Sequence, residues 1–496
     1  LSLLPFIRFI QTNINLIDTS TFKSLILINL PIFISIFTFS YLISVINKKL
    51  TFFDNSTFLL LAYNISFYFN EIKFFLLEYT SFASYFSLIV IFLFYLIILK
   101  IFKKKLFINF IFFYLFLRYL SIVYIATTSI IIHDKSNNNI EKKDLIFQNE
   151  KIIQNKFKQP NIYVVILDGM TSLEYAKKIL NINYDDHSKF LKNNNFETFK
   201  SRSNYNTTYL TLASILQMDY VVKQNSPRYF DRNNFWPYLL SKINKKPNLI
   251  KVLENNNYNF KWFGNMTASC KNYAYDNKFC PNNELNSTYY IFNSFFYNTP
   301  LITILRKLFP ELMLSYYGDK IDSIGNFINA NYIYKNSFVL IHHLSPHPPY
   351  IYNKDCSLIK NLNSSVISKN MKGYRDAYLC SLRKIEEFIN FINKNDPSAL
   401  VMITADHGWN INTKIKKSNL ISLMEEKTKI YNAMKIDKIC KKNIPKLLDS
   451  INSMRLLLGC AINRRPIFKK TEILYGFQEE DGKKFGKVYK LSNLSK

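Results

Sequence analysis

The sequence predicts an N-terminal transmembrane helix bundle followed by an α/β domain with a central, mostly parallel sheet. Two observations indicate this. Up to about residue 132 the chain is rich in Phe, Leu, Ile and Tyr and poor in acids, whereas the rest is an ordinary mixed sequence. In that later part, the runs 163–169 and 400–408 are apolar, β-branched stretches that stop at an acid closely followed by glycine. Buried strands of a parallel sheet have this pattern.

Residues 1–133 form the predicted transmembrane region, with three or four helices. A span needs about 20 apolar residues, and the stretches that qualify are 25–46, 82–102 and 106–132, with a shorter fourth at 58–69 interrupted by Asn64. Three lysines at 103–105 lie in the turn between two spans, so the positive-inside rule makes this turn cytoplasmic. Everything after His133 is then outside. With four spans, the chain either begins outside or has a further span before it.

The remaining chain is expected to have three parts. Residues 134–159 are polar and charged and are interpreted as a juxtamembrane linker. Residues 160–470 alternate between strand-like and helix-like patterns, which indicates one α/β domain. Residues 471–496 are largely polar with mixed charge and are interpreted as a tail.

The six cysteines all lie after residue 269, in the part predicted to face the outside. An even number of cysteines in a domain outside the cytoplasm favours disulfides. Cys270 and Cys280 are the easiest local pair, and buried free thiols are the alternative. The sequence has no C-x-x-C motif, which argues against zinc held through sulfur.

The net charge of +29 does not indicate a nucleic-acid partner. The lysines are spread along the chain among many asparagines and isoleucines, and no helix-turn-helix, zinc-finger or RNA-binding signature accompanies them. A basic surface facing anionic lipid head groups fits this distribution better. We therefore expect the membrane, and not nucleic acid, as the charged partner.

The α/β domain is expected to bring two distant acids together. Its predicted strands are 161–167, 338–341 and 400–404, and a helical pattern covers 373–393. Asp168 follows the first strand, and Asp406 with His407 follows the last. Because ligands bind beyond the carboxyl ends of parallel strands, these three side chains should meet at one edge of the sheet. Two carboxylates and an imidazole there predict a divalent metal site.

Histidines mark the same edge, since four of the six follow two predicted strands. We interpret His343 as a core or loop residue. His342 is interpreted as a substrate contact or a residue that supports the metal ligands. His347 lies between prolines, which stiffen the loop and orient the ring, and we expect it to line the site.

A candidate nucleophile lies in the run 203–215, where polar loop residues lead into the start of a buried helix. A hydroxyl at a helix N-terminus faces free N–H groups and the positive end of the helix dipole, which stabilise an alkoxide or a bound phosphate. The alternative is that Thr207 or Thr208 only caps the helix. The predicted metal ligands favour a nucleophile over a simple helix cap at this position.

These elements, taken in order, resemble the alkaline phosphatase superfamily. Within it the chain resembles the membrane-anchored sulfatase-like branch, which includes lipoteichoic acid synthases and lipid A phosphoethanolamine transferases. It is most similar to a bacterial sulfatase-domain group of that branch. The resemblance rests on an acid after the first strand, a Thr at a helix start, a proline-flanked histidine and Asp406-His407-Gly408, and it covers 161–468.

The resemblance implies roles for particular residues and an alkaline phosphatase-like fold for the domain. Asp168, Thr208, Asp406 and His407 match metal ligands for Zn²⁺ or Mn²⁺, and Thr208 also matches the threonine nucleophile. His347 matches a histidine that contacts substrate or a second metal. Two positions depart from the pattern: the first acid is Asp where the transferases usually have Glu, and Trp409 follows the Asp-His-Gly motif.

The implied function is a metal-dependent phosphoryl transferase of the bacterial inner membrane, with its catalytic domain outside the cytoplasm. A phospholipid head group is the expected donor and a cell-envelope glycan or lipid the acceptor. The alternatives are a phosphodiesterase or sulfatase-like hydrolase on the same fold, and a non-catalytic binding protein. No formylglycine motif occurs at Thr208, which argues against sulfate ester hydrolysis. The expected substrate contacts are His342, Asn204, Arg202 and Arg375.

Overall fold

A computed structural model describes residues 19–46, 146–152, 159–221, 247–264, 322–331, 333, 335–359, 371–409, 420–478 and 485–490. The chain divides into two compact units, Leu1–Lys142 with Glu284–Phe309, and Lys143–Asn283 with Pro310–Lys496.

Helix α2 (Thr19–Ile46) is the described part of the first unit, and it contains the predicted span 25–46. The predicted spans 58–69, 82–102 and 106–132 lie outside the described residues. Among the helices that the structure describes, none meets the length and hydropathy that a membrane crossing requires.

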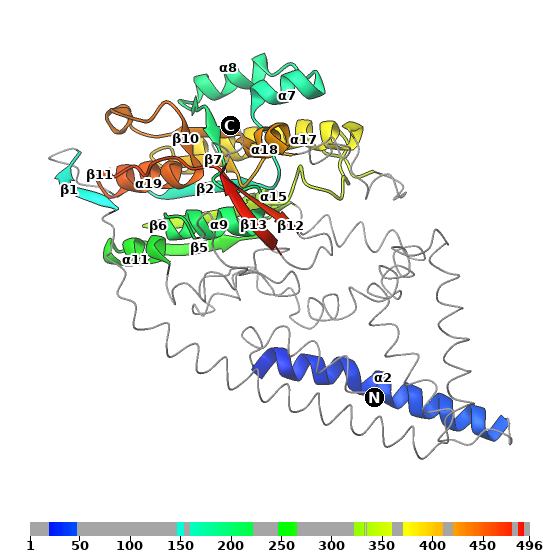
Figure 1. The fold of residues 1–496 in the computed structure, drawn as a ribbon. Coiled ribbons are helices and arrows are strands. Elements are labelled where there is room, and N and C mark those ends of the chain that lie inside the picture. The colour runs from blue at the N-terminus through cyan, green and yellow to red at the C-terminus, as the bar shows by residue number, and fades with distance from the viewer. Residues whose placement is uncertain are drawn as a thin grey trace. The chain divides into compact units, whose positions relative to one another are not determined.

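A six-stranded sheet forms the centre of the second unit, in the order β3-β9-β7-β2-β6-β5 (Figure 1). Strands β2, β6, β7 and β5 run parallel to one another, whereas β9 is antiparallel to β7, and the edge strand β3 is antiparallel to β9. The α/β architecture with a mostly parallel sheet is therefore confirmed. The strands are β2 (Ile162–Leu167), β3 (Glu197–Thr198), β5 (Asn259–Phe263), β6 (Ser337–His343), β7 (Leu400–Ala405) and β9 (Asn432–Lys435).

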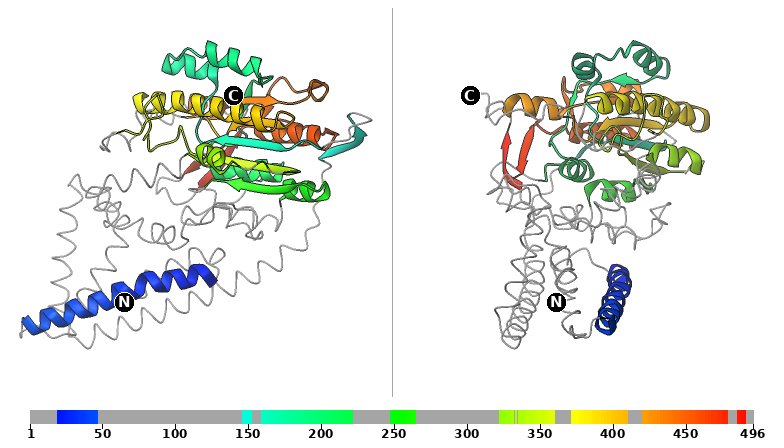
Figure 2. Two further views of the ribbon diagram at one scale, coloured as in Figure 1. Left: turned by 180° about the vertical axis from the view of Figure 1, so that it is seen from behind. Right: turned by 90° about the vertical axis from the view of Figure 1, so that its right-hand side faces the viewer.

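The three central strands are buried on both faces, as their continuous apolar runs predict. Alternate residues of β2 contribute to different cores: Tyr163, Val165 and Leu167 to one, and Ile162, Val164 and Ile166 to the other. Helices cover both faces (Figure 2). The first core includes α7 (Leu173–Leu180), α8 (Asp185–Asn193), α15 (Ser323–Ala330) and α17 (Met371–Asn395); the second includes α9 (Thr208–Gln217), α11 (Asn248–Asn255) and α19 (Ser450–Ala461).

The strand register decides which residues meet at the carboxyl edge of the sheet. Leu167, the last residue of β2, is paired with His343 of β6 and with Ala405 of β7. The next residues, Asp168 and Asp406, therefore leave the sheet at the same level on neighbouring strands. This is the juxtaposition that the sequence pattern predicted.

Two disulfides join elements of the second unit. Cys356–Cys380 links the segment after β6 to α17, and Cys440–Cys460 links the 3₁₀ helix η5 (Lys438–Lys441) to α19. Every cysteine in the described part of the chain is paired in this way. The predicted pair of Cys270 and Cys280 lies outside the described residues.

The segments expected to be a linker and a tail both contain strands. Strand β1 (Phe147–Lys151) pairs with β11 (Arg464–Pro466), and β12 (Leu474–Gln478) pairs with β13 (Phe485–Lys490). A further small sheet joins β10 (Leu448–Asp449), β4 (Ser201–Arg202) and β8 (Lys429–Ile430), and α18 (Leu420–Thr428) precedes β8.

Candidate metal centre

Three buried side chains converge at the carboxyl edge of the sheet. Asp168 follows β2, and Asp406 and His407 follow β7. One ligand atom from each of the three lies within 4.8 Å of the others. All three side chains are almost completely shielded from solvent. The structure thus brings together the three residues that the sequence predicted to share an ion.

The Asp406 carboxylate has one satisfied oxygen and one unsatisfied oxygen. Its Oδ1 accepts hydrogen bonds from the backbone N–H of Gly169 (2.9 Å) and from its own neighbour His407 (2.8 Å). Its buried Oδ2 has no hydrogen-bond partner among the described residues and lies 3.5 Å from His407 Nε2. A buried carboxylate oxygen without a donor is costly. A cation bound there would remove that cost.

The tautomer of His407 also fits a metal ligand. Its Nδ1 lies 2.8 Å from the carbonyl oxygen of Gly408. Because a carbonyl only accepts, Nδ1 must carry the hydrogen, and the lone pair of the neutral ring is then on Nε2. That atom faces the Asp168 Oδ1 at 3.6 Å. Ligating histidines are commonly oriented in this way by a carbonyl on their other nitrogen.

The charge of Asp406 disfavours ionisation of Asp168. Burial, together with the charge of Asp406, raises the pKa of Asp168 well above its usual range, and the hydrogen bond from Thr208 partly offsets this. Two buried acids and one imidazole form an O,O,N donor set suited to Zn²⁺ or Mn²⁺. A divalent cation would allow both acids to ionise in a buried site.

Thr208 lies beside these ligands. It is the first residue of α9, and its Oγ1 is 3.3 Å from His407 Nε2 and 3.5 Å from Asp168 Oδ1. Thr207 occupies the N-cap position, but its side chain makes no capping hydrogen bond. The Thr208 hydroxyl therefore faces the carboxylates, at the positive end of the helix dipole.

The histidines after β6 occupy different environments. His342 Nε2 is buried 3.9 Å from Asp168 Oδ2, without a hydrogen-bond partner among the described residues, and burial lowers the pKa of His342 to about 4. His343 faces away toward the Asp322 carboxylate at 3.9 Å and is also buried, as expected for a core residue.

His347 lies at the border of the site, on the loop after β6. Its Nδ1 is 2.6 Å from the carbonyl oxygen of Pro348, and the edge of its ring meets Trp409, with ring centroids 5.2 Å apart. Trp409 in turn covers Gly169, the residue after Asp168: a Cβ on Gly169 would lie 3.3 Å from the indole. His347 is thus connected to the candidate metal ligands through Trp409.

The other three predicted substrate contacts are not joined to the acids by any described contact. The buried Asn204 amide bonds Tyr220, the Glu472 carbonyl and the backbone N–H of Ile451. The Arg202 guanidinium is paired with Glu425 at 2.5 Å and donates to Thr428 Oγ1 at 3.1 Å. Arg375 lies on the exposed face of α17.

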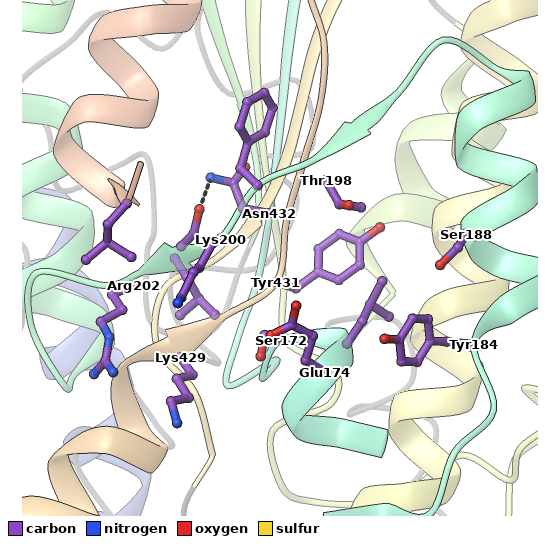
Figure 3. Close-up of a pocket in the computed structure, with 15 residues that line it drawn as sticks. Ser172, Glu174, Tyr184, Ser188, Thr198, Lys200, Arg202, Lys429, Tyr431 and Asn432 are labelled. Carbon is purple, nitrogen blue, oxygen red and sulfur yellow. Dashed lines mark hydrogen bonds between the residues drawn. The ribbon is translucent and has the colours of Figure 1, made fainter. Parts of the chain in front are cut away.

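Arg202 also lines a cavity of about 190 Å³ beside the loop that follows Asp168. Figure 3 shows Lys200, Arg202 and Lys429 on one side of this cavity and Tyr184 and Ser188 on the other. Glu425 neutralises part of the basic side, because Lys429 Nζ also lies 3.2 Å from its carboxylate.

Two tyrosines that were not predicted as site residues hold the loop after Asp168. The Tyr374 hydroxyl donates to the Gly169 carbonyl (2.8 Å) and accepts from the Thr171 N–H (3.2 Å). The Tyr378 hydroxyl donates to the Thr171 carbonyl at 3.0 Å. Both residues lie in the stretch 373–393 that the sequence pattern predicts to be helical. Tyrosine in place of phenylalanine at fully buried positions was the available signal, because a buried hydroxyl needs a partner.

No protein-family model and no curated protein matches the sequence. Several solved structures are similar in fold. The C-terminal periplasmic domain of EptC from Escherichia coli, in complex with Zn, is 12% identical with a TM-score of 0.42, over 70% of this chain and 96% of that one. EptA from Neisseria meningitidis, an integral membrane lipooligosaccharide phosphoethanolamine transferase, is 16% identical with a TM-score of 0.36, over 73% of this chain and 70% of that one.

A protein from a locus for glycosaminoglycan metabolism in Bacteroides thetaiotaomicron is 14% identical with a TM-score of 0.41, over 67% of this chain and 85% of that one. At these identities and TM-scores, the similarities carry no argument about what this chain does.

Proposed function

We propose that the protein is a metal-dependent phosphoryl transferase that uses Thr208 as a covalent nucleophile. The observation that supports this most is the position of the Thr208 hydroxyl, within 3.5 Å of both Asp168 and His407 and at the start of α9. A hydroxyl that only capped the helix would bond a backbone N–H instead of facing two potential metal ligands.

Asp168, Asp406, His407 and Thr208 would hold the ion. When bound, a divalent cation supplies Lewis acidity, which polarises a phosphoryl oxygen and favours the deprotonated form of a neighbouring hydroxyl. The protein itself would contribute in two further ways. The buried site excludes water, and the N-terminus of α9 directs the positive end of its dipole toward the transferred phosphoryl group.

The proposed reaction has two balanced steps. Thr208 Oγ1 gives up its proton and attacks the phosphorus of a phosphodiester; a new Oγ1–P bond forms, and the bond to the leaving oxygen breaks while that oxygen gains a proton. An acceptor hydroxyl then loses its proton and attacks the same phosphorus, the Oγ1–P bond breaks, and Thr208 Oγ1 regains a proton. Because His347 Nδ1 donates to the Pro348 carbonyl, Nε2 is the atom of His347 that would carry the proton to the leaving oxygen.

The proposed donor is a phospholipid head group, and the acceptor is a glycan or lipid of the cell envelope. This assigns 1–133 to the membrane, 134–159 to a juxtamembrane linker, 160–470 to the catalytic domain and 471–496 to a terminal segment. The apolar stretches before residue 133 support the assignment. The disulfides Cys356–Cys380 and Cys440–Cys460 support a location outside the cytoplasm, where such bonds persist.

The covalent step is tested with the full-length chain, loaded with Zn²⁺ or Mn²⁺, and bis(4-nitrophenyl) phosphate. We expect a burst of nitrophenolate of about one equivalent per chain and a phosphorylated peptide that contains Thr208. Thr208→Ala should abolish both, whereas Thr207→Ala, which alters the neighbouring hydroxyl, should retain them. Full turnover by Thr208→Ala would show that the nucleophile is wrong.

The acceptor is tested separately, because a hydrolase would share the first step and use water in the second. Vesicles of phosphatidylethanolamine or phosphatidylglycerol, labelled in the head group, are incubated with the chain and an envelope glycan extract. A transferase places the label on a glycan or lipid. Release of free labelled head-group phosphate alone, with or without the extract, would identify a phosphodiesterase.

A further inference from the structure

The Trp409 side chain contacts three residues, and it thereby links His347, at the border of the site, to Gly169, which follows Asp168. The indole is almost fully buried. It stacks on Tyr374, with ring centroids 5.9 Å apart and an interplanar angle of 25°. It meets the ring of His347 edge-on at 5.2 Å and 73°. On the third side it lies against Gly169, where an added Cβ would be only 3.3 Å from the indole.

The two rings that contact Trp409, Tyr374 and His347, differ in the other contacts that hold them. Tyr374 is anchored through its hydroxyl by Gly169 and Thr171, so it would keep its position without the indole. His347 is half-buried, and its Nδ1 lies beside the carbonyl oxygen of the adjacent Pro348. The backbone of its loop is fixed to α17 by the Ser345 hydroxyl, which accepts from Ser381 at 3.0 Å and lies 3.4 Å from the Ala377 carbonyl oxygen. The imidazole ring itself packs against Trp409.

From these contacts we infer that Trp409 is a positioning residue for His347, and the inference rests on the proposed function. The indole packs against Tyr374 and Gly169 and makes a T-shaped contact with the imidazole. Trp409 follows His407 by two residues, so the same segment provides a candidate metal ligand and the surface that places His347. A displacement of about 1 Å in such a group can cost on the order of a hundredfold in rate.

The inference predicts separate effects on metal binding and on turnover. Trp409→Leu keeps an apolar side chain but removes the aromatic surface. Because Tyr374 still holds the loop after Asp168, metal content should stay at the wild-type level. Turnover of bis(4-nitrophenyl) phosphate should fall by about tenfold or more, and Trp409→Phe, which keeps a ring, should restore most of it.

A double-mutant cycle distinguishes positioning from a general structural effect. If Trp409 acts through His347, Trp409→Leu should lower turnover much less in a His347→Gln chain than in the wild type. Phe388→Leu is the matched control, because Phe388 is a buried ring of the same core that packs on Tyr163 and Phe327, away from the site. It should change stability and leave turnover unaltered. Fully additive losses in the cycle would overturn the inference.

A spectroscopic measurement tests the contact without reference to activity. In the full-length chain with ¹³C-labelled histidine, the Cε1–H signal of His347 is assigned by its loss in His347→Gln. Trp409→Leu should move that signal by removing the indole ring current, whereas Phe388→Leu should not. An unmoved signal would exclude the positioning role. If the signal moves but His347→Gln retains full turnover, the contact stands and the proton-transfer role of His347 fails.

Discussion

Two buried aspartates of this domain, Asp406 and Asp449, show how a structural acid differs from a functional one. Both are fully shielded from solvent. Asp449 uses both oxygens: Oδ1 accepts from the Asn452 N–H at 2.8 Å, and Oδ2 accepts from the Asn452 side chain at 3.0 Å and from Thr471 at 2.6 Å. Asp406 has an oxygen with no donor among the described residues, close to a second acid.

The difference identifies which acid needs a ligand from outside the protein. Burial raises the pKa of Asp449, and its hydrogen bonds oppose that shift. At the candidate metal centre, the charge of one aspartate adds to burial in raising the pKa of the other. Asp449 therefore stabilises the folded chain as a helix cap and a link to residue 471. Asp168 and Asp406 together are unfavourable unless a cation joins them.

The largest expected effect is that of Asp406→Asn. The substitution keeps the shape of the side chain but removes a charge that a divalent cation requires. Metal content should fall from about one ion per chain to background, and turnover should be lost. With chelator present, thermal stability should stay equal to that of the wild type or rise, because a buried charge has gone. If Asp406→Asn retained the metal, the contrast between Asp406 as a metal ligand and Asp449 as a structural acid would be wrong.

Asp449→Ala should have the opposite pattern. Loss of three hydrogen bonds, one of which caps α19, should lower the free energy of unfolding by about 1–3 kcal/mol. Metal content per folded chain should not change. Chemical denaturation and elemental analysis of the same preparation measure both quantities. A loss of metal with intact stability would place Asp449 in the site and contradict its structural role.

Tyr374→Phe tests whether the hydroxyl of Tyr374 holds the loop after Asp168. Removing the hydroxyl leaves the Gly169 carbonyl and the Thr171 N–H without their buried partner, so we expect a loss of about 1–2 kcal/mol. Metal affinity should weaken by about tenfold, because the loop orients a ligand. Tyr378→Phe removes one bond from the same loop, farther from Asp168, and should affect metal affinity less. If the two variants weakened metal affinity equally, Tyr374 would not be more important than Tyr378 for orienting Asp168.

The effect expected to be smallest at neutral pH is that of His343, because it is confined to acidic pH. Burial lowers the pKa of His343 to about 4 from an ordinary value of 6.5. The unfolded chain therefore binds a proton between these values while the folded chain does not, so stability is complete above pH 6.5 and declines as the pH falls toward 4. His343→Gln should reduce this slope by up to about 1.4 kcal/mol per pH unit. Urea titrations at several pH values test this, and an unchanged slope would contradict it.

The sequence was sufficient to predict the strands and the acids that follow them. Long apolar runs that end at Asp168 and Asp406 specify buried parallel strands, and their register then brings both acids to one edge of the sheet. Patterns of this kind are recognised within a few neighbouring residues and need no knowledge of long-range contacts. The chemistry of carboxylate and imidazole is specific enough to suggest a metal once they meet.

The remaining details depend on contacts that the sequence does not encode locally. Arg202 is a predicted substrate contact, and its pairing with Glu425, far along the sequence, was not predicted. The hydroxyls of Tyr374 and Tyr378 bond the loop after Asp168 from about two hundred residues farther along the chain. Neither described disulfide could be chosen among the possible pairings of six cysteines.

The central claim is that Asp168, Asp406 and His407 share one cation with Thr208. Anomalous diffraction from crystals of the Zn²⁺- or Mn²⁺-loaded protein tests it most directly. We predict one strong anomalous peak at about 2.0–2.2 Å from an oxygen of each aspartate, His407 Nε2 and Thr208 Oγ1, and no peak there in Asp406→Asn. A wild-type crystal that binds the ion elsewhere, with Thr208 turned away from the carboxylates, would contradict the account.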